Sequence, residues 1–453
     1  MLPGNKAKNI FLACSSIVFY SFGQLVYLPL FLLSVLTNYI SGRLLCSAEK
    51  GRRLILSASV VLNLGILGVF KYTDFLIENI NALFSLSIPA AGIVLPIGIS
   101  FFTFQGMSYV IDTYRDKSSG TKNFVKVLLY ISFFPQLIAG PIVKYHDIAL
   151  QIDERVSEAN LSAAGIRRFI LGLGKKIIFS NAAGYIADQV FNVYLPSGSL
   201  DMRLAWLGGI CYSLQIYYDF SGYSDMAIGM GKMFGFHFLE NFNYPYSSVG
   251  IVEFWRRWHI SLSSWFKEYL YIPLGGNRKG RLRTAINKLT VFFCTGIWHG
   301  ANWTFVVWGM CHGLLSSLES SGIIPVKKLS RTAVGRLLCR IYTLLAVMLL
   351  FVIFRADSLG DGFRLIGAMF SAEFNAAGAE ALTALLNPAA VVTLLLSVFL
   401  CTKRSAAIRD CVERTELSNV KQLAINLSCI IVYLLCVFSL ARGGFNPFIY
   451  FQF

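Results

Sequence analysis

The chain has 453 residues, of which 55% are hydrophobic, 14% are aromatic and only 14% are charged. Because soluble domains carry about a quarter charged residues, this composition excludes an ordinary soluble enzyme. The net charge of +16 does not require a nucleic-acid partner. In a membrane protein, basic residues flank the cytoplasmic ends of helices and meet anionic lipid.

Long uncharged runs predict a polytopic, all-α membrane protein. Taken in chain order, the runs of membrane length are residues 9–42, 54–70, 89–111, 381–402 and 422–441. Pro29 is expected to divide the first of them into two helices. Shorter apolar runs are residues 127–143, 166–191, 204–218, 289–296, 302–318 and 341–354. At about 20 residues for each span, we predict about ten transmembrane segments. They would form one membrane-embedded domain over residues 1–453, with residues 360–380 as a surface loop.

The distribution of basic residues indicates one element that does not cross the membrane. Basic stretches at residues 43–53 and 115–126 fit the cytoplasmic side if the apolar runs alternate in direction. Simple alternation then places the basic stretch 267–288 outside. One element between residues 144 and 288 must therefore be horizontal or re-entrant, and such backbone survives at membrane depth only inside protein or along a cavity.

A histidine lies within the uncharged run at residues 289–318. His299 is expected there at a helix break between Gly296 and Gly300, with Asn302 as the N-cap of the next helix. An ionisable group at membrane depth is costly and indicates function. An imidazole, whose usual pKa is about 6.5, suits proton abstraction from a hydroxyl. The alternative is a core histidine bonded to a backbone carbonyl.

A second histidine, His259, follows an aromatic and basic segment. Gly250 and Glu253 resemble the start of an amphipathic helix. Its apolar face would contain Trp255, Trp258, Leu262, Phe266 and Tyr269. Arg256 and Arg257 fall away from that face, either as snorkelling side chains at the interface or as ligands of a phosphate. His259 shares the aromatic side, which a role beside His299 would explain.

Other candidate groups have structural alternatives. Asp219 and Asp225 could balance Arg256 or Arg257, or bond a ligand, and structural charge pairing is the favoured role. His312 is expected to pack between helices. The ten cysteines show neither a CxxC pair nor metal-ligand spacing, so no metal site is predicted.

Several blocks of the sequence together resemble one family. These blocks are residues 95–105, 134–141, 219–225, 240–246, 255–259, 271–278, 298–300 and 446–453. The set resembles the membrane-bound O-acyltransferases, and within them the alginate O-acetyltransferase subgroup. The resemblance implies helices around a central tunnel, re-entrant cytoplasmic pieces and a catalytic core within residues 204–318. It also implies that His299 is the catalytic histidine and His259 the second histidine.

The function expected from this resemblance is acetyl transfer from cytoplasmic acetyl-CoA to a hydroxyl outside the membrane. The acceptor would be a polysaccharide, or a partner protein with an esterase-like domain, and the location a bacterial cytoplasmic membrane. No permanently bound cofactor is expected. The residues expected to bind substrate or acyl-CoA are Trp255, Arg256, Arg257, Trp298, Asn302 and Asp225. Two alternatives stay open: transfer of a D-alanyl or longer acyl group, and a proton-coupled transporter.

Overall fold

The computed structural model describes residues 4–138, 140–414, 418–443 and 447–449, and all regular structure within them is helical. The predicted all-α class is therefore confirmed. Of the sequence block at 446–453, residues 446 and 450–453 lie outside the described residues. The chain forms two units, Met1–Ser162 with Met230–Leu239, and Ala163–Gly229 with Glu240–Phe453. The prediction of a single domain stays a prediction.

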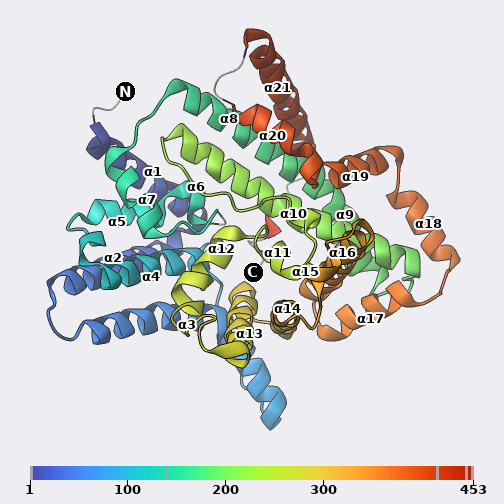
Figure 1. The fold of residues 1–453 in the computed structure, drawn as a ribbon, viewed down its shortest axis with the longest axis horizontal. Coiled ribbons are helices and arrows are strands. Elements are labelled where there is room, and N and C mark those ends of the chain that lie inside the picture. Colours follow the sequence, from blue (N-terminus) through green and yellow to red (C-terminus); the bar gives the residue numbers. More distant parts are fainter. Residues whose placement is uncertain (1–3, 139, 415–417, 444–446, 450–453) are drawn as a thin grey trace. The chain divides into compact units, whose positions relative to one another are not determined.

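The first unit consists mainly of the helices coloured blue to teal in Figure 1. They are α1 (Gly4–Gln24), α2 (Leu28–Ser47), α3 (Arg52–Phe84), α4 (Ile99–Arg115), α5 (Phe124–Ser132), α6 (Phe134–Leu137) and α7 (Tyr145–Glu154). Helix α2 packs against α3 and α4, and α1 packs against α5. The predicted division of residues 9–42 is confirmed, because a short 3-10 turn at Leu25–Tyr27 separates α1 from α2 and Pro29 lies in the first turn of α2.

Three predicted spans in this unit have different bounds. The run at 54–70 continues as α3 to Phe84. The run at 89–111 is helical only from Ile99, because two prolines and a left-handed Gly98, with φ of 79°, precede the helix. The run at 127–143 is interrupted after Ser132, and the separate short helix α6 follows, with Pro135 in its first turn.

The second unit contains the two histidines of interest. Its elements up to residue 271 are α8 (Ala159–Gly174, from residue 163), α9 (Asn181–Gln189), α10 (Met202–Met233, up to residue 229), α11 (Ile251–Trp255) and α12 (Ile260–Phe266). They are followed by α13 (Gly280–His299), α14 (Trp303–Ser321), α15 (Val326–Leu329), α16 (Ala333–Arg355), α17 (Leu359–Phe370), α18 (Ala376–Leu385), α19 (Pro388–Leu400), α20 (Ala406–Glu413) and α21 (Asn419–Ala441). Short π-helical stretches continue α8, α9 and α12.

Here too, some expectations from the sequence were wrong. Residues 360–380 are mostly helical, in α17 and α18, and not a loop. Helix α10 extends well beyond the predicted end at residue 218. The expected amphipathic helix is divided into α11 and α12, and Glu253 accepts a hydrogen bond from the backbone of Val249 instead of from the N-cap. Because α11 and α12 are too short to cross a bilayer, they support the predicted non-spanning element between residues 144 and 288.

Four helical segments of the described residues are long and apolar enough to cross a membrane. They are Gly4–Ser47, Arg52–Phe84, Ala333–Arg355 and Asn419–Ala441. A fifth would be the pair α18 and α19, which meet at 78°. The protein is therefore polytopic by length and composition, whereas the predicted total of about ten segments stays a prediction.

Close packing of α13 and α14 depends on glycine. A Cβ atom added to Gly309 would lie 2.4 Å from the backbone oxygen of Phe292, and one added to Gly296 would lie 2.5 Å from that of Phe305. Neither distance is possible for real atoms, and backbone cannot move aside as a flexible side chain can. These two residues therefore fix the separation of the two helices.

We predict that Gly309→Val destabilises the protein by about 1–3 kcal/mol, the usual cost of overpacking. The measurement is the Tm of the purified protein in detergent. Gly367→Ala on α17 is the matched control, because nothing lies within 4 Å of a Cβ atom at that position. An unchanged Tm for Gly309→Val would contradict the packing described here.

Candidate functional site

His299 is the last residue of α13, and the chain turns directly after it. The helix runs through Gly296 without a break, so the expected break lies at Gly300 alone, whose backbone is extended. A Cβ atom at Gly300 would lie 2.1 Å from the ring of Phe305. A side chain there would push the turn away from α14. The glycine therefore allows His299 to lie at the junction of the two helices.

Asn302 caps the following helix, as the sequence predicted. Its side-chain oxygen accepts a hydrogen bond from the backbone N–H of Thr304 at 3.0 Å. Its amide nitrogen donates to the backbone oxygen of Asp357, also at 3.0 Å. Both ends of the amide are thus used in fixing the turn between α13 and α14.

Aromatic rings surround the His299 imidazole. The ring centroids of Trp298, Trp308 and Phe354 lie 5.0, 5.1 and 5.2 Å from that of His299. His299 is buried, with 5% of its surface exposed. Its surroundings are therefore apolar and exclude most of the solvent.

His259 lies beside His299 and has a strained backbone. The two imidazole centroids are 6.4 Å apart, and the Phe220 ring packs against His259 at a centroid distance of 4.4 Å. His259 is the N-cap of α12, with φ of 45° and ψ of 52°. A left-handed conformation at a residue other than glycine is uncommon and persists only where its surroundings impose it.

Asn241 supplies that constraint, and the sequence did not single it out. Its backbone oxygen accepts from the N–H of Ile260 at 2.9 Å. Its side-chain oxygen accepts from both the N–H and the hydroxyl of Ser261, at 3.1 and 2.9 Å. Asn241 thus holds the first residues of α12, and with them the direction of His259. The sequence signal was its place in the block at 240–246, one of the blocks that carry the family resemblance.

The aromatic segment before His259 connects to the same cluster. Trp255 donates from its indole nitrogen to Nδ1 of His312 at 3.2 Å, and its ring lies 5.7 Å from Trp308. His312 is therefore packed between helices, as predicted. Trp298 contacts His259 at a centroid distance of 6.1 Å. Trp255 and Trp298 thus belong to the aromatic cluster around the two histidines.

The two arginines of this segment have different surroundings. Arg257 forms an ion pair with Glu253 at 2.8 Å and donates to the backbone oxygen of Asn243 at 3.1 Å. Arg256 is exposed. Neither arginine balances Asp219 or Asp225, so the predicted pairing was wrong.

The partners of Asp225 are Arg168 and Lys175. Arg168 lies 2.6 Å from Asp225 and 2.7 Å from Glu240, and it also pairs with Glu413. Lys175 reaches the second oxygen of Asp225 at 2.6 Å. The favoured role of Asp225, charge pairing, is confirmed. We call Arg168, Lys175, Asp225, Glu240 and Glu413 the buried ion cluster, because Arg168 is almost fully buried at its centre.

Asp219 has a similar position one turn and a half earlier on α10. It pairs with Lys176 and accepts a hydrogen bond from the backbone N–H of Ile449 at 2.9 Å. The sequence signal was the spacing of Arg168 and Lys176, which places both on one face of a helix. That spacing could have predicted a helix with a charged inner face.

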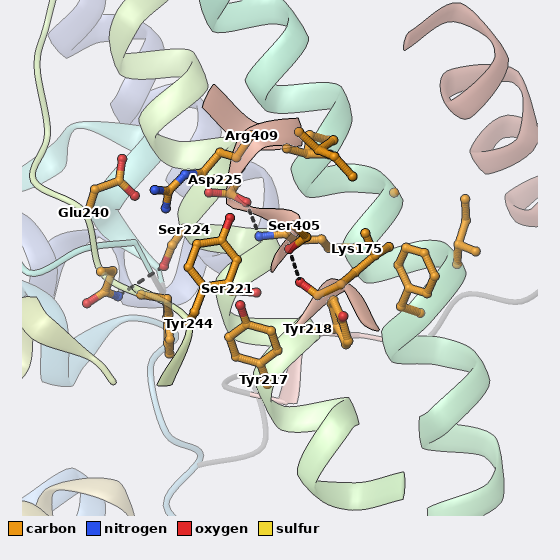
Figure 2. A pocket seen from close by; sticks show the side chains of 18 of the residues that line it. Lys175, Tyr217, Tyr218, Ser221, Ser224, Asp225, Glu240, Tyr244, Ser405 and Arg409 are labelled. Atoms are coloured by element: carbon orange, nitrogen blue, oxygen red, sulfur yellow. Dashed lines mark hydrogen bonds and ion pairs between the residues drawn. The ribbon is translucent and has the colours of Figure 1, made fainter. Parts of the chain in front are cut away.

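A first cavity lies beside the buried ion cluster. Its volume is about 240 Å³, and its polar lining includes Lys175, Tyr217, Ser221, Tyr244 and Arg409. Figure 2 shows Lys175 directed at Asp225 and the hydroxyls of Tyr217 and Tyr244 near the same space. Apolar side chains from α8, α19 and α21 complete the wall. The cavity is amphipathic, with cationic groups among its polar lining.

A second cavity, which we call the polar cavity, lies close to His299, because Asn302 and Phe354 line it. Its volume is about 370 Å³. Asp188, Asn192, Tyr212, Gln215, Arg355 and Asp357 provide most of its polar lining, and Asn302 and Phe354 also line it. Phe354 contacts the His299 ring. Of the predicted site residues, only Asn302 lies here, and the sequence gave no reason to group the others.

The structure thus brings together His259, His299, Trp255 and Trp298, with Asn302 fixing the adjoining turn. Asp225 belongs to the buried ion cluster, and Arg256 to an exposed position. The close histidine pair in an apolar setting suits proton transfer to and from a hydroxyl.

Comparisons with known proteins agree on one family. The model of the membrane-bound O-acyltransferase family matches residues 12–354. The probable alginate O-acetylase AlgI of Azotobacter vinelandii is 35% identical, over 98% of this chain and 95% of its own length. The peptidoglycan O-acetyltransferase of Helicobacter pylori is 36% identical, over 80% of this chain and 75% of its own. The teichoic acid D-alanyltransferase of Bacillus subtilis is 28% identical, over 50% of this chain and 59% of its own.

We predict that Arg168→Met strongly reduces stability, because it leaves three carboxylates without their shared cation. Removing one partner of a buried ion pair costs about 3–5 kcal/mol. The yield of monodisperse protein and its Tm in detergent measure the effect. Arg364→Met is the control, since its pair with Asp361 is largely exposed and such pairs contribute at most about 1 kcal/mol. Equal decreases in yield and Tm in the two variants would contradict a central role for Arg168.

A second prediction concerns pH. Burial lowers the pKa of His259 well below its ordinary value, and the neighbouring His299 lowers it further. An unfolded chain takes up this proton as the pH falls through about 6.5. The unfolded state then binds more protons than the folded one, so stability decreases as the pH falls below that value.

The variant His259→Gln removes this proton uptake. Its Tm should fall less than that of the wild type between about pH 7.5 and about pH 5. Thermal unfolding at the two pH values provides the test. The same decrease in both proteins would mean that His259 is not held neutral in the fold.

Proposed function

The chain belongs to the membrane-bound O-acyltransferase family and is a polytopic acyltransferase, and from this premise we propose that it transfers an acetyl group to a hydroxyl of a cell-envelope polymer. The donor is acetyl-CoA. The acceptor is an extracytoplasmic polysaccharide, or a partner protein that passes the acetyl group on. The names of the relatives, two O-acetylases or O-acetyltransferases of envelope polymers among them, support this choice.

The observation that supports the chemistry most directly is the position of His299. It lies at the end of α13, in a stretch without acidic or basic residues, and beside a second histidine. In the proposed reaction His299 takes the proton from the acceptor hydroxyl. The hydroxyl oxygen attacks the thioester carbonyl, and His259 donates a hydrogen bond to the developing oxyanion. When the carbon–sulfur bond breaks, the coenzyme A thiolate leaves and receives the proton from His299.

Asn302 has a supporting part in this proposal. Its amide already bonds Thr304 and the backbone of Asp357. We therefore assign oxyanion stabilisation to His259 and treat Asn302 as the residue that positions the His299 turn.

The donor would approach along exposed basic residues. Arg256, the turn residues Arg278 and Lys279, and Arg281 and Arg283 at the start of α13 are exposed. Guanidinium and ammonium groups form charge-assisted hydrogen bonds with phosphate, and the donor has several phosphates. Arg257 is less available, because Glu253 already neutralises its charge.

The proposed location is a bacterial cytoplasmic membrane, which separates a cytoplasmic donor from an external acceptor. If the acceptor is a partner protein, its esterase-like domain outside the membrane would pass the acetyl group on to the polymer. Transfer of D-alanyl is the second candidate function, because a teichoic acid D-alanyltransferase resembles half of this chain. The transporter interpretation is set aside, because the family consists of acyltransferases.

We predict that His299→Ala reduces acetyl transfer by about 10²–10⁴-fold, the usual contribution of a general base. The assay follows radiolabel from acetyl-CoA into envelope polymer and membrane proteins in vesicles that contain the wild type or the variant. His237→Ala is the matched control, since His237 is exposed. Equal transfer by His299→Ala, at equal amounts of folded protein, would refute the role of His299.

The same vesicles can be given a labelled D-alanyl donor in place of acetyl-CoA. If label is incorporated only from the D-alanyl donor, the proposed acetyl transfer is wrong and D-alanyl transfer is the function. Incorporation from acetyl-CoA alone would support the proposed function.

A further inference from the structure

We propose that the polar cavity binds the acceptor, and that it selects an uncharged, hydroxyl-rich sugar and not a uronate. This inference rests on the proposed function, because it names the chemical class of the molecule that accepts the acetyl group. The relevant residues are Tyr212, Gln215, Asp188, Arg355, Asp357 and Phe354, which all line the cavity.

Two buried polar atoms at this cavity call for a ligand. The hydroxyl of Tyr212 and the side-chain oxygen of Gln215 are inaccessible and have no hydrogen-bond partner among the described residues. Their side chains are nine-tenths or more buried, with 0% and 5% of the residue surface exposed. Buried polar atoms are normally hydrogen-bonded. Because both residues line one cavity, the two atoms together indicate a ligand group that bonds both.

A hydroxyl group has the required chemistry. The oxygen of Gln215 can only accept a hydrogen bond, whereas the Tyr212 hydroxyl can donate one. A ligand hydroxyl could donate to the former and accept from the latter at the same time. Gln215 and Tyr212 are three residues apart on α10, so their side chains lie on one face of the helix.

The cavity also adjoins the proposed catalytic residue. Phe354 lines it and has its ring 5.2 Å from that of His299. Asn302, three residues after His299, lines it as well. A sugar held in this cavity would therefore contact Phe354, which itself contacts the His299 imidazole. The volume of about 370 Å³ falls within the range of small-molecule sites.

The charges of the cavity argue against an anionic acceptor. Arg355 is already paired with Asp188 at 2.9 Å and lies 3.3 Å from the side-chain oxygen of Asn192. Asp357 adds a second carboxylate. With one guanidinium against two carboxylates, the lining has a formal excess of one negative charge. A ligand carboxylate would be repelled, whereas an uncharged ring with several hydroxyls could bond Asn192 and both carboxylates.

The test is equilibrium binding to the full-length protein in detergent, measured with two fluorescent tetrasaccharides. One is a neutral N-acetylglucosamine tetramer and the other a mannuronate tetramer. We expect the neutral probe to bind more tightly. Tyr212→Phe and Gln215→Met should each weaken its binding about tenfold, the effect of losing one hydrogen bond of about 1.4 kcal/mol.

Tyr20→Phe is the matched control. The Tyr20 hydroxyl is also buried without a hydrogen-bond partner among the described residues, but Tyr20 does not line the polar cavity. This variant should bind the neutral probe as the wild type does. Elution of all variants as one symmetrical peak, with the Tm of the wild type, excludes misfolding as the cause of a loss.

Acetyl transfer measured in parallel separates the two proposals. If transfer depends on His299 but the neutral probe does not bind, or binds equally to both cavity variants, the cavity assignment is wrong and the proposed function stands. If the neutral probe binds and the variants weaken it, while no acetyl moves, the cavity assignment stands and the proposed function falls. Tighter binding of mannuronate than of the neutral probe would overturn the selectivity.

Discussion

The backbone contact between α13 and α14 sets the geometry on which the candidate site depends. Gly296 and Gly309 allow the two helices to approach until backbone meets backbone. Gly300 then lets the chain turn beneath the ring of Phe305. Because His299 is the residue immediately before that turn, its direction follows from the packing of two helices and not from a mobile loop. Sites built on helices hold their geometry better than sites on loops.

His259 is held by a separate device. Its strained backbone would relax if the first turn of α12 were free, and Asn241 prevents this with bonds to Ile260 and Ser261. Asn241 itself donates to Ser224 on α10 at 3.1 Å. Since α10 also contributes Asp225 to the buried ion cluster, the second histidine is tied to the most highly charged part of the interior. The two histidines thus come from independently supported elements that meet at one place.

The sequence predicted the all-α class and two local features, the division near Pro29 and the cap at Asn302, because such features depend on short patterns. Uncharged runs, Pro29 and the cap at Asn302 act within a few residues, and the structure has them where expected. The helix ends were less predictable. Apolar composition does not distinguish the helical part of residues 89–111 from its extended start, which two prolines and two left-handed glycines impose. Likewise, the small residues of 360–380 were compatible with a loop until packing of α17 against α16 made them helical.

The partners of the buried charges could not be predicted, because they depend on which helices become neighbours. Arg256 and Arg257 are close in sequence to His259, and the sequence offered them as partners of Asp225. The actual partner, Arg168, lies on α8, and the buried ion cluster around it includes Glu413 from α20. The lining of the polar cavity could not be predicted for the same reason. Tyr212, Asn302 and Arg355, which all line it, come from three distant parts of the chain. Contacts of this kind require the tertiary arrangement.

The apolar surroundings of His299 are consistent with the chemistry proposed for it. A thioester can lose its acyl group to water as well as to an acceptor hydroxyl, so an acyltransferase benefits from a dry reaction centre. Three aromatic rings within about 5 Å of the imidazole, at 5.0, 5.1 and 5.2 Å, leave little room for a competing water. Phe354 both contacts the His299 ring and lines the polar cavity, so the acceptor that we propose for this cavity would be held next to the apolar centre.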